Sequence, residues 1–133
     1  MKSRDDAGKL VLRLVLGGLM LFHGTHKLLH GIAPIVGMVT SHGLPALFAY
    51  GVLVGEVVAP ILILAGYYAR LGGLLVVVNM VVAVLLAHAG QLFALAPSGG
   101  WQLELQAFYL FSGLLVFLFG AGRYSLRSKG RWS

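Results

Sequence analysis

Three histidines and a lysine interrupt the end of the first apolar stretch of this chain, at positions 23, 26, 27 and 30. Their spacing is i, i+3, i+4 and i+7, which places all four side chains on one face of a helix. Imidazole titrates near neutral pH, and both side chains can donate hydrogen bonds to a carbonyl oxygen. Ionisable groups within a membrane helix face the interior of the protein, so this stripe predicts an internal polar pocket.

Glu56 lies near the middle of the second apolar stretch. A carboxylate at mid-bilayer costs about 2.5–3.5 kcal/mol on insertion scales, so it must be paired, protonated or hydrated. Pro60 follows four residues later, and its missing N–H frees the carbonyl oxygen of Glu56. Gly51, Gly55 and Ala59 form a ridge of small residues on the same helix, which lets a neighbouring helix approach closely.

Estimated depths sort the other polar side chains into two layers. Asn79 falls near the centre of the third apolar stretch, level with Glu56, whereas Lys27 and His88 fall about 12 Å outward at 1.5 Å per residue. Glu104 falls in the outer third of the fourth stretch. The predicted ligand-binding residues are therefore His23, His26, Lys27, Glu56, Asn79, His88 and Glu104.

Glu56 and His26 are the predicted catalytic groups, because a buried carboxylate and an imidazole can exchange protons with a ligand. A purely structural pairing of Glu56 with His23 or Arg13 stays open as an alternative. Lys27 could pair with Glu104 or extend to the lipid headgroups. Arg13, Pro60, Gly51 and Gly55 are assigned structural roles.

The absence of cysteine excludes disulfides, thiolate chemistry and cysteine-ligated iron–sulfur clusters. No established metal-ligand motif is present, so no metal site is assigned. A zinc or copper site that uses the histidines, and a haem held by His23 or His26 together with His88, remain alternatives.

The composition indicates that these residues lie in a membrane domain. The chain has 133 residues, of which 59% are hydrophobic and 11% are charged, whereas soluble domains carry about 25% charged residues. So short a chain cannot bury this much apolar surface alone, so the excess must face lipid. By length, residues 1–133 form one domain.

Four apolar segments approach the ~20 residues that a helix needs to cross a bilayer. Their sequences do not alternate as the strands of a membrane β-barrel would. The pattern predicts an all-α, polytopic membrane four-helix bundle. In the first loop, APIVGMVTSHGLP predicts a short interfacial helix that begins at Pro34 and ends before Gly43. The predicted spans are residues 10–29, 46–66, 71–89 and 103–120.

The basic residues predict the orientation of the bundle. Nine of the ten Lys and Arg residues flank the two termini or the second turn, and Lys27 alone lies on the other side. The positive-inside rule therefore puts both termini in the cytoplasm. The basic residues line no soluble face, so we expect contact with anionic lipid and no nucleic-acid binding.

Several short motifs together resemble the DoxX family of small membrane proteins. They are Arg13 in LRLVLG, HGTHKL at residues 23–28, Gly55-Glu56, Gly66 and Arg70 in GYYAR, and GAGRYSL at residues 120–126. The resemblance implies a multi-pass protein of the bacterial cytoplasmic membrane. It also implies a link to redox chemistry, because some members are subunits of quinone-reducing oxidoreductases.

The resemblance and the polar pocket together favour a quinone-site subunit that works with an oxidoreductase partner or as a homo-oligomer. Histidine and lysine can donate to quinone carbonyls, and apolar walls can hold an isoprenoid tail. The chain has no cysteine cluster to carry electrons, so these would come from a partner or a bound cofactor. A small-molecule or metal transporter and a structural membrane anchor are the alternatives.

Overall fold

The computed structural model describes residues 2–88, 90, 93–126, 130, 132 and 133. Helices make up almost all of the regular structure, and two of them contain a π-helical segment, labelled η. The elements in chain order are α1 (Lys2–His30), α2 (Ala33–Ser41), α3 (Phe48–Leu53), η1 (Val54–Val58), α4 (Ala59–Ala65), α5 (Ala69–Ala83), η2 (Val84–His88) and α6 (Glu104–Phe119).

Three helices in the described part of the chain are long and apolar enough to cross a membrane. They are Arg4–His30 within α1, Phe48–Ala65 formed by α3, η1 and α4 together, and Ala69–Leu86 from α5 into η2. These confirm the all-helical membrane class and match the first three predicted segments. The fourth predicted segment is occupied by α6, which has only 16 residues.

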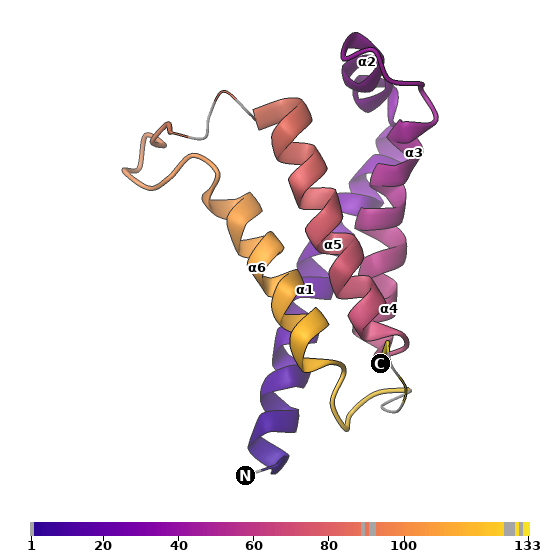
Figure 1. The fold of residues 1–133 in the computed structure, drawn as a ribbon, viewed down its shortest axis with the longest axis vertical. Helices are drawn as coiled ribbons and strands as arrows, with labels where there is room; N and C mark the ends of the chain where they lie inside the picture. Colours follow the sequence, from indigo (N-terminus) through magenta and orange to yellow (C-terminus); the bar gives the residue numbers. More distant parts are fainter. Residues whose placement is uncertain (1, 89, 91–92, 127–129, 131) are drawn as a thin grey trace.

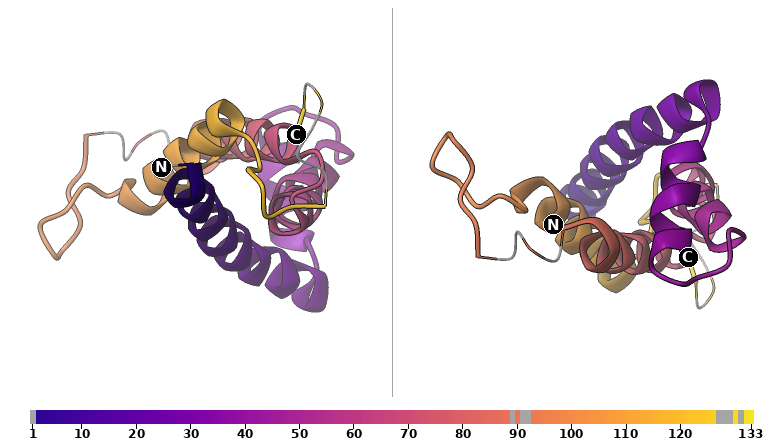
Figure 2. Two further views of the ribbon diagram at one scale, coloured as in Figure 1. Left: turned by 90° about the horizontal axis from the view of Figure 1, so that it is seen from below. Right: turned by 90° about the horizontal axis from the view of Figure 1, so that it is seen from above.

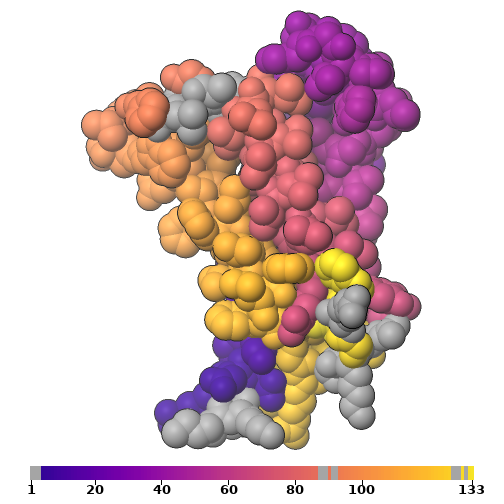
Figure 3. All heavy atoms as spheres, viewed as in Figure 1, coloured from indigo at the N-terminus to yellow at the C-terminus, as the bar shows by residue number. Residues whose placement is uncertain are grey.

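The four long segments alternate in direction along the molecule (Figure 1). Both chain termini lie towards one end, and α2 lies at the other. Views along the bundle show that α1 leans away from the remaining helices (Figure 2). At the α2 end, residues 93–103 project on the opposite side of α5 from α2 (Figure 3).

The first loop contains the predicted short helix. α2 carries Pro34 in its first turn and ends before Gly43, whose φ of 79° requires the left-handed region. α1, by contrast, begins at Lys2 rather than near Leu10. Its polar first turns continue the helix beyond the apolar segment, with Asp5 placed favourably near the positive end of the helix dipole.

The helices pack closely where glycines remove the side chain. A methyl group at Gly73 of α5 would lie 2.5 Å from the Gly113 carbonyl oxygen of α6. A methyl at Gly55 would lie 2.5 Å from the Cβ and Cγ atoms of Asn79. Gly55 and the fully buried Ala59 therefore make the predicted close contacts. Gly51 does not, because a methyl there meets nothing within 4 Å.

At the end of the bundle that holds the two termini, the Arg13 side chain links α1 to backbone carbonyls of two other segments. Its side chain is buried, and the residue is only 1% exposed. The guanidinium donates to the carbonyl oxygens of Ile63, Leu64, Ala121 and Tyr124 at 2.9, 3.1, 2.9 and 2.6 Å. Unpaired carbonyl oxygens at helix ends attract cations. Arg13 therefore supplies hydrogen-bond donors to carbonyl oxygens at the end of α4 and in the segment that follows α6. The alternative pairing of Arg13 with Glu56 is therefore wrong.

Candidate functional site

The centre of the candidate site is an ion pair between Lys27 of α1 and Glu56 of η1. Lys27 Nζ donates to Glu56 Oε2, and the two side chains are 26% and 7% exposed. The sequence had suggested Glu104 or the lipid headgroups for Lys27, and His23 or Arg13 for Glu56. The structure instead pairs Lys27 and Glu56 with each other.

The backbone of η1 positions Glu56. The π-helical segment ends at Val58, two residues before Pro60, whose ring nitrogen cannot donate to the Glu56 carbonyl. Gly24 of α1 covers this freed carbonyl. A methyl at Gly24 would overlap the carbonyl oxygen and lie 2.6 Å from the carbonyl carbon. The freed carbonyl is therefore covered by a helix-packing contact.

Two cavities meet at the ion pair. The first, here called the α6-side cavity, has a volume of 190 Å³ and lies between α1, η1, α5 and α6. The second, the α2-side cavity, has a volume of 230 Å³ and includes Ile35 and Met38 of α2. Lys27, Glu56 and Ala83 line both cavities. The charged groups of Lys27 and Glu56 therefore face both cavities.

Further polar groups line the α6-side cavity. His23 lies there with its Nδ1 3.1 Å from the Leu19 carbonyl oxygen. A carbonyl can only accept, so this contact puts a proton on Nδ1 and leaves Nε2 as the acceptor of the neutral ring. The His23 ring also meets Tyr109 edge to face, with centroids 5.6 Å apart. Gln106 completes the polar lining, and its Oε1 atom is buried without a hydrogen-bond partner.

Gln106 and Tyr109 were not predicted as site residues. Gln106 and Tyr109 lie in an otherwise apolar segment, where an aromatic residue more often packs against a neighbouring helix or faces lipid. The available signal was their i, i+3 spacing, which places the two side chains on one face of α6.

Asn79 lies on the other side of the ion pair. It is 9% exposed, lines the α2-side cavity and packs against Gly55. The structure therefore brings His23, Lys27, Glu56 and Asn79 around the two cavities. The estimated depths had placed Lys27 in the outer layer, apart from Glu56 and Asn79.

The remaining predicted site residues lie elsewhere. His26 is exposed, stacks on His30 with ring centroids 4.2 Å apart, and lines neither cavity. Glu104 is exposed, and its carboxylate lies against Gly100, where a methyl would be 2.5 Å from Oε2. The side chain of His88 lies outside the described residues. Among those that are described, no group of three or more His, Cys, Asp or Glu residues could hold a metal ion.

Apolar space adjoins each polar cavity. A cavity of 260 Å³ between α5 and α6 shares Gln106 with the α6-side cavity. Another of 340 Å³, between α2, α3 and α5, shares Val52, Asn79, Val82 and Leu86 with the α2-side cavity. A polar centre with apolar extensions suits a ligand that has a polar head and an apolar tail.

Comparison with known proteins places this architecture in a family. The DoxX family model matches residues 8–89, which include Lys27 and Glu56 but not Gln106 or Tyr109. An uncharacterized protein of Haemophilus influenzae is 31% identical over 121 residues, which cover 89% of this chain and 87% of that protein. No solved structure matches. The chain belongs to the DoxX family.

Proposed function

We propose that this protein binds a quinone within the membrane and serves as the quinone-site subunit of a redox system. The observation that carries the proposal is the Lys27–Glu56 pair, with a buried carboxylate and a partly buried ammonium, between two small cavities. Cavities of 190 and 230 Å³ are smaller than the ~300–1,000 Å³ typical of drug-sized ligands, which suits a single ring.

The donors around the α6-side cavity fit a quinone head. Lys27 has N–H groups beyond the one that it gives to Glu56, and Tyr109 adds a hydroxyl from α6. When bound, a quinone supplies electron and proton transfer. Glu56 would hold or release a proton next to the ring, and Lys27 would stabilise the carboxylate while it is charged.

The adjoining apolar cavities would hold the isoprenoid tail. The cavity between α5 and α6 continues from Gln106 towards Trp101 and Phe111. Its walls offer the tail dispersion contacts and keep water from the polar centre. The chain has no cysteine for an iron–sulfur cluster, so a partner oxidoreductase would deliver or receive the electrons.

The proposed topology has four spans, with both termini at the cytoplasmic face of a bacterial inner membrane. α6 has 16 residues, or about 24 Å at 1.5 Å per residue, and would cross by thinning the bilayer locally. α2 would lie at the outer interface. Single cysteines can test this, because the chain has none. Ser41→Cys and Ser98→Cys should react with an impermeant maleimide on intact spheroplasts, and Arg123→Cys only after lysis.

The function is tested by ligand retention. The protein is purified in native lipid discs, and its quinone content per chain is measured by extraction and mass spectrometry. We expect quinone in stoichiometric amount with the wild type and its loss from Glu56→Gln and Tyr109→Phe. His26→Ala is the matched control, because His26 lies on the same helix as Lys27 but lines neither cavity.

Other outcomes would favour the other functions. Quinone absent from wild-type discs, and no binding of added short-tailed quinone, would reject the proposal. A stoichiometric metal would favour a metal transporter instead. An assembly partner that is captured equally by wild type and Glu56→Gln, without any ligand, would favour a structural anchor.

A further inference from the structure

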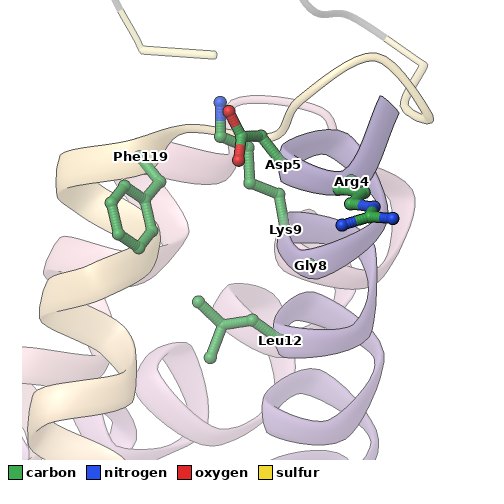
Figure 4. Close-up of a pocket in the computed structure, with 6 residues that line it drawn as sticks. All are labelled: Arg4, Asp5, Gly8, Lys9, Leu12 and Phe119. Carbon is green, nitrogen blue, oxygen red and sulfur yellow. The ribbon is translucent and has the colours of Figure 1, made fainter. Parts of the chain in front are cut away.

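A second candidate site lies at the other end of the molecule from the ion pair. It is a groove of 510 Å³ between the first turns of α1 and the last turn of α6. Arg4, Asp5, Gly8, Lys9 and Leu12 line it from α1, and Phe119 lines it from α6. Lys9 and Asp5 lie at its mouth, Leu12 lies deeper, and Phe119 faces them across the opening (Figure 4).

The mouth of the groove is basic. Arg4 and Lys9 carry positive charge and Asp5 carries one negative charge, which leaves a net positive charge on the lining. A second acid, Asp6, accepts a hydrogen bond from the backbone N–H of Arg123 at 3.2 Å. The groove is also open, because a methyl at Gly8 would meet nothing within 4 Å.

The deeper part of the groove is apolar and continues onto the membrane-spanning surface. Leu12 and Phe119 form its walls, and Phe119 is 51% exposed. Val15 and Leu19 follow Leu12 at i+3 and i+7, so they extend the same stripe of α1. They are 54% and 47% exposed. An acyl chain that enters beside Leu12 can therefore run along α1 without leaving apolar surface.

We infer that an anionic phospholipid binds in this groove. Its phosphate lies at the mouth beside Lys9, with Arg4 adding positive charge from the adjacent face of α1, and one acyl chain lies between Leu12 and Phe119. Basic residues at a membrane surface attract anionic headgroups, and the apolar wall distinguishes a lipid from a soluble anion. The site is separate from the Lys27–Glu56 cavities, so it holds whether or not those cavities bind quinone.

The test uses the full-length protein, delipidated in an uncharged detergent. Binding of phosphatidylglycerol and phosphatidylcholine is measured by native mass spectrometry, and lipid-induced stabilisation by the shift in melting temperature. We expect preferential binding of phosphatidylglycerol. An energy of ~1 kcal/mol for each basic residue corresponds to an affinity about fivefold higher for the anionic lipid. The double variant Arg4→Gln/Lys9→Gln should therefore lose most of the preference for phosphatidylglycerol over phosphatidylcholine.

Arg123→Gln is the matched control, because it removes an exposed positive charge at the same end without touching the groove lining. Equal phosphatidylglycerol preference in the wild type and the double variant would overturn the inference, as would no preference in the wild type. Glycerol 1-phosphate should give no stabilisation, and a full effect from it would show a soluble-anion site instead. Melting without added lipid checks folding, and Lys9→Gln alone replaces the double variant if that variant melts early.

Discussion

Gly24 of α1 lies directly against the peptide carbonyl of Glu56. Three residues later on the same helix, Lys27 binds the Glu56 carboxylate. α1 thus contacts both the backbone and the side chain of one residue. The missing side chain at Gly24 lets the two helices approach closely, and the ion pair forms beside that contact.

The first prediction concerns this close approach. Gly24→Ala should destabilise the protein by ~1–3 kcal/mol, the usual cost of overpacking, because its methyl would meet backbone atoms that cannot turn away. Gly18→Ala is the control, since a methyl there meets nothing within 4 Å. Alanine in place of glycine within a helix should raise the stability by ~0.5–1 kcal/mol. Unfolding in mixed detergent micelles measures both. Equal stability of the two variants would contradict the close approach.

The second prediction is an asymmetry between the partners of the ion pair. Lys27→Met leaves a carboxylate that is only 7% exposed without its cation, and breaking such a buried pair costs ~3–5 kcal/mol. Glu56→Gln should cost less, because the Lys27 side chain is 26% exposed and its flexible stem can reach the headgroups. Mixed-micelle unfolding of each variant gives the comparison.

The double variant Lys27→Met/Glu56→Leu supplies the control for the second prediction. It removes both charges and should recover most of the stability lost by Lys27→Met, since apolar replacements of buried pairs are often neutral. Additive losses in the double variant would mean that the two residues act independently.

Sequence reasoning predicted the first three spans because the lengths of apolar runs follow from bilayer thickness. It missed the Lys27–Glu56 pairing because it set depths from helix midpoints. The actual level of one helix against another is fixed by contacts, and Gly24 brings Glu56 within reach of Lys27.

The α6 side of the site was missed for a related reason. The apolar sequence of α6 has no strong polar face, so its rotation about its own axis cannot be read from the sequence alone. That rotation follows from the contact between Gly73 and Gly113, and it turns Gln106 and Tyr109 towards α1. Such a contact between two glycines leaves little periodic signal in either helix.

The third prediction tests the carbonyl cluster around Arg13. Arg13→Lys keeps the charge, but a single ammonium cannot span carbonyls on two separate segments, as the planar guanidinium does. Each buried carbonyl left without a donor costs ~1–3 kcal/mol, so we expect a loss of at least ~2 kcal/mol in mixed-micelle unfolding. Arg123→Lys, at an exposed position, should be neutral. An unchanged stability of Arg13→Lys would mean that water replaces the lost donors.

The fourth prediction separates the cavities from the charges. Ala83 lines both cavities beside the ion pair, so Ala83→Leu should fill them without altering Lys27 or Glu56. Ala107→Leu instead fills the apolar cavity next to Gln106. With a short-tailed benzoquinone as the probe, Ala83→Leu should abolish binding, measured by equilibrium dialysis in lipid discs. Ala107→Leu should weaken long-tailed more than short-tailed quinones, because only the tail uses that space. Undiminished binding to a well-folded Ala83→Leu variant would move the ligand away from the ion pair altogether.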